Sequence, residues 1–315
     1  MKLKQFILLA AFGLTASATL TSCEDILGHW EKPTPVTPTP SGSEEESVPG
    51  LLTGKFTINA SGNQVRFSQG NLQAKIASYA SNVATASEWQ FAANQYDMVH
   101  TTYGSYDWSA GEWVDLFSWV GTSATNNTYG LNTFTSTTQE NHGDQMTDVL
   151  KTDWGEAAKA SIGTGWRTLS SAEWTYLFNT RSASSIGTTV NARYAKAKVN
   201  NVQGVILFPD TYTHPDDVTA PTGINATDDT GWNGNDYSAD DWTKMETAGA
   251  VFLPAAGYRN GALVNGVDSY GDYWSSTANS TSDAYCVDFA SGILQAAKDY
   301  VRGNGYSVRL VRPAE

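Results

Sequence analysis

The chain has 315 residues and carries 32 acidic against 19 basic side chains, which gives a formal net charge of -13 at pH 7. This charge argues against binding to nucleic acid or to an anionic lipid surface. Tryptophan and tyrosine number 11 and 15 while charged residues make up only 16%, a mixture common in loop-rich β structures and in surfaces that bind carbohydrate or protein.

The N-terminal segment has the features of a signal peptide. Two lysines precede an apolar run from Phe6 to Leu20, which is too short for a stable transmembrane span. The run ends in Leu20-Thr21-Ser22-Cys23, which resembles the lipobox of bacterial lipoproteins, where the cysteine is acylated and becomes the first residue. We therefore expect residues 1–22 to be removed and Cys23 to be lipidated. An ordinary secretory signal with an incidental cysteine is the alternative.

Residues 23–50 form a segment of biased composition. Prolines recur through residues 33–40, and an acidic Ser/Gly stretch follows. Such a segment is extended and cannot bury a core, so we expect a linker that carries a folded domain, residues 51–315, on the lipid anchor. Acidic residues directly after the cysteine resemble the surface-export signals of Bacteroidetes lipoproteins. They imply an outer-membrane location at the cell surface, with the periplasmic face as the alternative, and membrane contact through the lipid alone.

The first half of the folded domain shows mainly strand and loop patterns. Alternating polar and apolar residues at 55–58 and 64–67, separated by a Gly/Asn turn, predict a β-hairpin. Residues 89–91 predict another short strand. Residues 100–150 show little periodicity and predict loops, pinned to the core by aromatic and apolar side chains at Trp113, Leu116, Phe117 and Trp119.

The second half contains two helices with clear start signals and several strands. Ser170 with Glu173, and Ser238 with Asp241, are N-terminal capping pairs before apolar helical faces. Apolar runs at 204–209 and 250–254 predict buried strands. Further strands are expected at residues 273–276, 284–289 and 307–311. The prediction is an α+β domain with mixed short strands, two main helices and many loops.

Several segments together resemble formylglycine-generating-enzyme-like domains, which have a C-type lectin-like fold. Residues 165–174 are similar to the family's "WRLPTEAEWEYA" segment, a strand end followed by a capped helix, and residues 302–311 to its terminal "R…GFRLV" strand. Residues 273–277 and 284–292 complete the pattern. The set is also similar to Bacteroidetes lipoproteins of this fold, including variable proteins of diversity-generating retroelements. The resemblance implies this fold and a receptor- or adhesin-like domain that binds a protein or glycan ligand at the cell surface.

In those variable proteins the diversified positions lie late in the domain and face solvent. Carried onto this sequence, the candidates for ligand contact are Asp268, Tyr270, Asp272, Tyr273, Trp274, Asp283, Tyr285, Asp288, Lys298 and Tyr300. Trp274 is equally a candidate for the scaffold. Because side chains alternate along a strand, Asp283 and Tyr285 face away from Cys286 and Asp288. The candidates therefore cannot all contact one ligand.

The oxidase activity of the same superfamily, as the resemblance implies, depends on a pair of cysteines and copper. Beyond Cys23 only Cys286 remains, and one thiol reproduces neither that site nor an intrachain disulfide. Its place in an alternating strand indicates a small buried hydrophobe. No nucleophile-elbow pattern accompanies the histidines at 29, 100, 142 and 214. We therefore expect a non-catalytic protein without a cofactor. An accessory subunit of a surface appendage or uptake complex is the alternative, and it predicts a large contiguous apolar patch.

Acidic residues crowd the segment before the second helix. Asp229-Thr230-Gly231-Trp232-Asn233-Gly234 resembles part of a calcium loop, but Gly231 occupies position three and no Glu occupies position twelve. The sequence therefore predicts no metal site, with calcium as an alternative. Asp240 and Asp241 are expected to stabilise the helix start instead.

Overall fold

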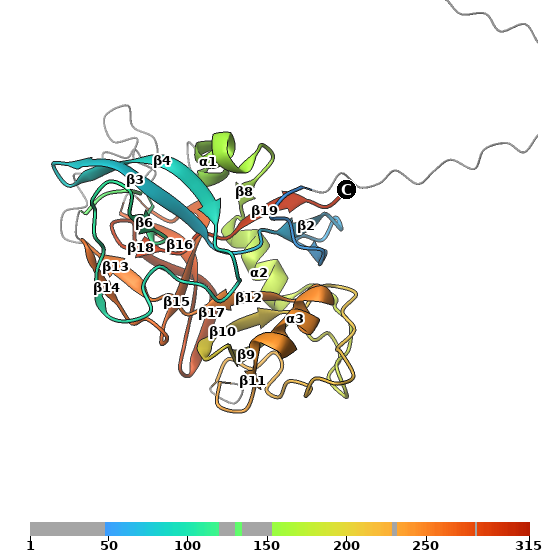
Figure 1. Cartoon of the computed structure of the whole chain (residues 1–315). Helices are drawn as coiled ribbons and strands as arrows, with labels where there is room; N and C mark the ends of the chain where they lie inside the picture. Colours follow the sequence, from blue (N-terminus) through green and yellow to red (C-terminus); the bar gives the residue numbers. More distant parts are fainter. Residues whose placement is uncertain (1–47, 120–129, 134–152, 229–231, 281) are drawn as a thin grey trace, which may run out of the picture. The chain divides into compact units, whose positions relative to one another are not determined.

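In the computed structural model the two ends of the folded domain meet in one sheet. The structure describes residues 48–119, 130–133, 153–228, 232–280 and 282–315. The expected hairpin is confirmed as β1 (Phe56–Thr57) and β2 (Gln64–Phe67), which pair antiparallel. On its far side β2 pairs with β19 (Leu310–Pro313), and β19 pairs with β8 (Arg167–Thr168). Figure 1 shows β2, β19 and β8 grouped together on one side of the domain.

A long hairpin, β3 (Leu72–Ala80) and β4 (Val83–Phe91), extends beyond the short strand expected at residues 89–91. Ser81 and Asn82 join its strands with φ of 53° and 66°, the positive values that a tight two-residue hairpin turn requires. The two-residue strand β6 (Trp113–Val114) pairs with β3. Much of the outer half of this hairpin is exposed and made of small residues such as Ala, Ser and Thr, so its sequence carries little hydrophobic alternation.

A five-stranded sheet of short strands lies near this hairpin. Its order is β5 (Gly104–Ser105), β14 (Leu263–Asn265), β13 (Tyr258–Asn260), β18 (Gly305–Tyr306) and β7 (Phe117–Ser118). Residues 100–150 were predicted to form loops. Where the structure describes this region, it contains the short strands β5, β6 and β7 among the loops. Leu116, Phe117 and Trp119 are buried there, as expected.

Three helices occur among the described residues. The two expected helices are confirmed as α2 (Ser171–Asn179) and α3 (Ala239–Thr247), and both begin with a reciprocal capping box. The third, α1 (Trp154–Ile162), was not expected. The Asp153 side chain caps it by accepting the Gly155 backbone N–H at 2.9 Å. Among the described residues, no helix has the length and apolar character that crossing a membrane requires.

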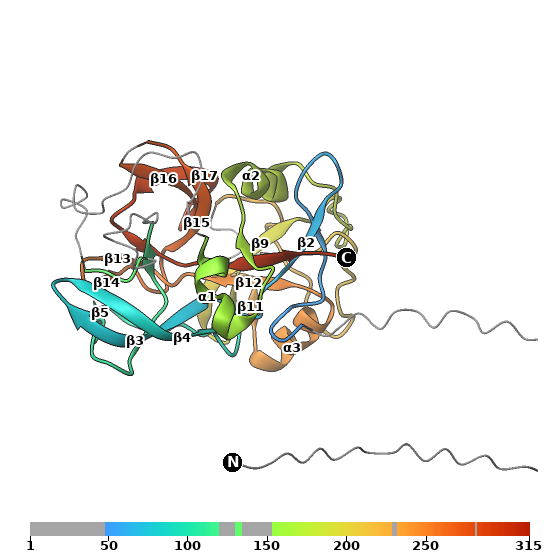
Figure 2. The same cartoon turned by 90° about the horizontal axis from the view of Figure 1, so that it is seen from above.

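Two further sheets complete the fold. One has the order β11 (Asp236–Tyr237), β9 (Tyr194–Val199), β10 (Val202–Leu207) and β12 (Val251–Pro254), and it contains the two expected buried strands. The other has the order β15 (Gly271–Ala278), β16 (Asp283–Ala290) and β17 (Ile293–Val301). Figure 2 shows β16 and β17 close to α2, which packs against all three strands of that sheet. Strands and three helices confirm the α+β class.

Candidate functional site

Tyr273 and Trp274, two of the residues predicted to contact a ligand, lie in the core. Both side chains are fully buried. The Tyr273 hydroxyl donates to the Pro254 carbonyl at 2.8 Å, and the Trp274 indole donates to the Phe117 carbonyl at 2.6 Å. These neighbours on β15 point to opposite faces, and each face is covered by a separate core cluster. The expectation of a ligand-facing Tyr273 is therefore corrected, and Trp274 belongs to the scaffold.

Asp272 and Asp288 are buried cross-strand neighbours on β15 and β16. Burial and the nearby Asp288 raise the pKa of Asp272 well above its usual range. Burial also raises the pKa of Asp288. Among the described residues, Asp272 Oδ1 has no hydrogen-bond partner. Two close carboxyl groups in a desolvated site oppose each other's ionisation, so we expect this pair to hold a proton to a higher pH than an exposed aspartate does.

Lys298 and Tyr300 stand on β17 beside this carboxyl pair. The Tyr300 hydroxyl donates to Asp288 Oδ2 at 3.3 Å, and Lys298 Nζ lies 5.3 Å from the centroid of the Tyr300 ring. Both side chains are half-buried. The structure thus brings four predicted residues together, but Asp272 and Asp288 lie beneath the surface and offer no face to a ligand.

Asp268 and Tyr270 lie together in the turn before β15, away from the carboxyl pair. Asp268 adopts a φ of 58° and its carboxylate accepts the Gln203 backbone N–H at 2.6 Å. Tyr270 is 44% exposed, and its ring packs edge-on against Tyr258 with 6.2 Å between centroids. Asp268 therefore holds the turn to β10, and the partly exposed Tyr270 ring packs on Tyr258 beside that turn.

Asp283 and Tyr285 lie on the β16 face opposite to Cys286, as the alternation of a strand predicts. Asp283 Oδ2 accepts the hydroxyls of Ser280 and Ser282 at 2.9 and 2.6 Å. Tyr285 is half-buried and pairs in register with Asp299. The ten predicted residues consequently fall on a turn, on two faces of a sheet and in the core, and they do not form one binding surface.

Cys286 is buried on β16, between Trp274 and Lys298 of the adjacent strands. Burial, reinforced by the nearby carboxyl groups of Asp272 and Asp288, raises the pKa of its thiol well above the usual range. A protonated thiol is a poor nucleophile and a poor metal ligand. Its position agrees with the expectation of a small buried hydrophobe.

The partial calcium loop begins at residues 229–231, which lie outside the described residues. Within the described part, no group of three or more His, Cys, Asp or Glu side chains could hold a metal ion. Asn235 is buried, and its side chain bridges the Lys196 and Thr222 carbonyls at 2.8 and 2.9 Å. Asp241 caps α3 through the Ser238 hydroxyl and backbone, as expected.

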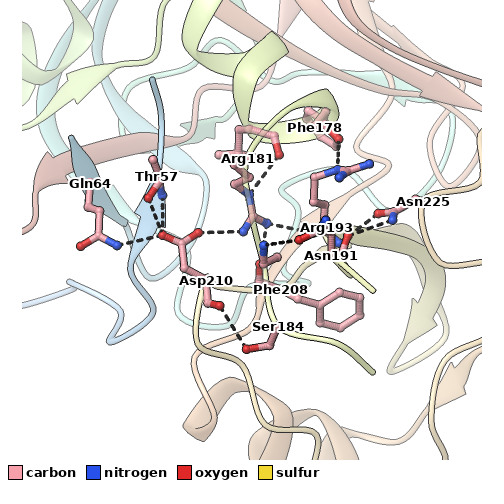
Figure 3. Close-up of polar contacts among 12 residues, drawn as sticks. Thr57, Gln64, Phe178, Arg181, Ser184, Asn191, Arg193, Phe208, Asp210 and Asn225 are labelled. Atoms are coloured by element: carbon pink, nitrogen blue, oxygen red, sulfur yellow. Dashed lines mark hydrogen bonds and ion pairs between the residues drawn. The ribbon is translucent and has the colours of Figure 1, made fainter. Parts of the chain in front are cut away.

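A polar network centred on Arg181, just after α2, joins the end of that helix to the N-terminal hairpin (Figure 3). The Arg181 guanidinium is fully buried and donates to Asp210 Oδ1 at 3.0 Å. It also donates to the Leu177 carbonyl at 3.0 Å. Asp210 Oδ2 accepts the Thr57 N–H and hydroxyl, at 2.8 and 2.7 Å, and the Gln64 amide at 2.8 Å. Burial lowers the pKa of Arg181 to about 10, so it stays protonated at neutral pH. Every group in this network has a partner, which marks it as structural.

An open cleft of about 570 Å³ lies where the end of β3 meets the segment after β5. We call it the Tyr79 cleft. Its lining combines aromatic rings, small hydroxyls and one carboxylate: Ser78, Tyr79, Tyr106, Asp107, Trp108, Ser109 and Ala110. Sequence reasoning missed it because β3 was not expected and residues 100–150 were treated as loop. The alternation of aromatic and small polar residues from Tyr103 to Ser109 was the available signal.

The aromatic wall of the Tyr79 cleft, formed by Tyr79 and Trp108, is fixed by contacts with neighbouring residues. The Tyr79 and Trp108 rings lie 5.7 Å apart with 31° between their planes, and the Tyr79 hydroxyl contacts the Thr133 hydroxyl at 2.7 Å. Trp108 packs on the buried Arg259 guanidinium, 5.3 Å from its ring centroid. Arg259 donates to four backbone carbonyls, those of Leu116, Gly130, Asn132 and Gly261. Tyr79 nevertheless keeps 40% of its surface exposed, so the wall is both fixed and accessible.

The charge of the cleft comes from Asp107. Its exposed carboxylate accepts the Ser109 backbone N–H at 2.8 Å, and the bonds from Ser109 hold the pKa of Asp107 below its usual range. Asp107 is therefore ionised at neutral pH. Tyr106, which also lines the cleft, is buried, and its hydroxyl donates to the buried Asp115. Among the described lining residues there is no Lys, Arg or His. The cleft is consequently aromatic, hydroxyl-rich and negatively charged.

The sequence model of one protein family, described as a domain of unknown function (DUF8237), matches residues 224–311. The match begins before α3 and covers the whole β15–β17 sheet. No curated protein and no solved structure matches the chain.

Proposed function

We propose that this chain is a lipid-anchored lipoprotein of the cell envelope whose C-type lectin-like domain binds a ligand without catalysis. The fold assignment is supported by the segment similar to "WRLPTEAEWEYA". That segment forms β8 followed by the capped helix α2, as the resemblance implies. The anchor assignment is supported by Leu20-Thr21-Ser22-Cys23 after an apolar run.

The observation that carries the binding function is the Tyr79 cleft. It is a shallow, open cleft whose aromatic wall is preorganised by Arg259, and Tyr79 presents an exposed ring. Sites that bind small molecules combine an apolar or aromatic wall with a few placed polar groups. A rigid wall also reduces the entropy lost when a ligand binds.

The alternative of an accessory subunit predicts a contiguous apolar patch, and the described surface does not favour it. Its exposed large hydrophobic residues lie on five separate segments: Tyr79, Tyr103, Val190, Tyr270 and Ile293. Scattered exposed apolar side chains of this kind are ordinary. The distribution therefore supports a polar and aromatic binding site more than a large protein interface.

The test compares wild-type protein with Tyr79→Ala on an array that carries both glycans and peptides. The full-length lipidated chain is used in a detergent without a sugar headgroup. Tyr270→Ala is the matched control, because it removes a tyrosine of similar exposure, 44% against 40%. The proposal expects at least one bound class to be lost in Tyr79→Ala and kept in Tyr270→Ala. Binding that survives Tyr79→Ala throughout, with unchanged melting temperature, contradicts the cleft as the binding site.

A further inference from the structure

The exposed Tyr79 ring offers a flat apolar surface next to hydrogen-bonding groups. Because one side of Tyr79 faces Trp108, 5.7 Å away, the ring cannot easily turn or retract. A pyranose ring has the complementary character, with C–H groups on one face and hydroxyls around its edge. We propose that the Tyr79 cleft binds a neutral carbohydrate chain, an inference that rests on the binding function proposed above.

The polar lining suits sugar hydroxyls. Asp107 presents an ionised carboxylate, which accepts hydrogen bonds more strongly than a neutral group does. Its bond from the Ser109 backbone N–H fixes the carboxylate beside the aromatic wall. The Ser109 side chain lines the same cleft; its hydroxyl bonds Asp107 and can still accept a hydrogen bond. The Asp107 carboxylate and the Ser109 hydroxyl can therefore bind the hydroxyl edge of a sugar while Tyr79 contacts its C–H face.

The charge of the cleft selects neutral over acidic carbohydrate. The ionised Asp107 has no basic residue beside it among the described lining residues, and the whole chain carries a formal charge of -13. A uronate or sialate carboxylate would meet like charge on approach. Arg259 does not offset this, because its buried guanidinium is directed at backbone carbonyls.

The lining also favours carbohydrate over a peptide. Among the described lining residues the largest aliphatic side chain is the methyl group of Ala110, so the cleft lacks an apolar pocket for a Leu, Ile or Met anchor. Buried apolar and aromatic anchors carry most of the affinity at protein interfaces. The cleft is open rather than enclosed, so its walls do not limit the ligand to a single sugar unit.

The experiment is titration calorimetry with full-length lipidated protein in the same detergent. The probes are neutral hexasaccharides of β-1,4-glucose, β-1,3-glucose, α-1,4-glucose and β-1,4-mannose, with hexagalacturonate as the acidic counterpart. We expect at least one neutral hexasaccharide to bind and hexagalacturonate not to bind. Tyr79→Ala should weaken that binding about tenfold or more, and Asp107→Asn, which keeps the turn but removes the charge, about tenfold. Tyr270→Ala should leave it within about twofold.

The outcomes separate this inference from the binding function. If none of the neutral hexasaccharides binds while array peptides bind in a Tyr79-dependent way, the carbohydrate inference is overturned and the binding function stands. Equal binding of hexagalacturonate overturns the selection for neutral sugar. If sugar binding persists in Tyr79→Ala and is lost in Tyr270→Ala, the cleft assignment is wrong. If neither sugars nor peptides show Tyr79-dependent binding, both proposals fall.

Discussion

Removing Asp210 tests whether the network around Arg181 holds the N-terminal hairpin to the rest of the domain. In Asp210→Ala the buried Arg181 guanidinium loses its ion-pair partner at 3.0 Å. The Thr57 N–H, its hydroxyl and the Gln64 amide lose their common acceptor in the same change. The positive charge stays buried in the variant because an arginine guanidinium does not deprotonate in proteins at neutral pH.

The expected loss follows from the burial of the two partners. Deleting one member of a buried ion pair costs about 3 to 5 kcal/mol, because the remaining charge is left uncompensated. The Asp210 side chain keeps 13% exposure, so water can enter beside Arg181 and the lower end, about 3 kcal/mol, is the better expectation. For a domain of this size that corresponds to a fall in melting temperature of about 6 °C or more.

The assay is chemical and thermal unfolding, followed by circular dichroism, of wild type, Asp210→Ala and the exposed control Asp216→Ala. The double variant Arg181→Met/Asp210→Ala should recover part of the loss, because it removes the uncompensated charge as well. A fall of less than about 1 kcal/mol in Asp210→Ala would refute the reasoning, as would a double variant that is less stable than Asp210→Ala alone.

Three further predictions concern the anchor, the carboxyl pair and the core. Cys23→Ser should release the protein into the soluble fraction after cell lysis, and continued membrane retention would show that Cys23 is not the anchor. The raised pKa of Asp272 favours the fold below the pKa of the unfolded chain, about 3.9, and this contribution is lost as the pH rises through the folded pKa. Asp272→Asn should therefore gain stability relative to wild type as the pH rises above about 4; parallel melting curves from that pH to neutral pH would contradict it. Tyr273→Ala should destabilise the domain by about 3 to 5 kcal/mol because it empties a fully buried site, and a melting temperature near that of wild type would mean that Tyr273 is not in the core.

Elements with local signals were predictable from the sequence. The capping pairs at Ser170 and Ser238 start α2 and α3 because the capping side chain and the backbone that it caps lie within one turn. The β3–β4 hairpin and β17 were missed because small residues, mainly Ala and Ser or Thr, weaken the contrast between their polar and apolar positions. Helix α1 was missed because its cap, Asp153, follows a segment without periodicity.

The site residues were harder to predict because burial is decided by distant segments. In a strand with one face exposed to solvent, core and surface residues alternate along the sequence. Strand β15 is covered on both faces, so Asp272, Tyr273 and Trp274 are all buried. A bulge between Cys286 and Asp288 also breaks the alternation that places residues on β16. The Tyr79 cleft joins segments about thirty residues apart, and the residue pattern within one segment does not show that it will lie beside the other.

The most direct test of the proposed binding function is the dissociation constant of one ligand, the tightest-binding neutral hexasaccharide, measured for Tyr79→Ala and Tyr270→Ala. The two tyrosines have similar exposure, and only Tyr79 lines the cleft. We predict a dissociation constant at least about tenfold higher for Tyr79→Ala than for Tyr270→Ala, with equal melting temperatures. Equal dissociation constants, or a larger loss in Tyr270→Ala, would contradict binding in the Tyr79 cleft.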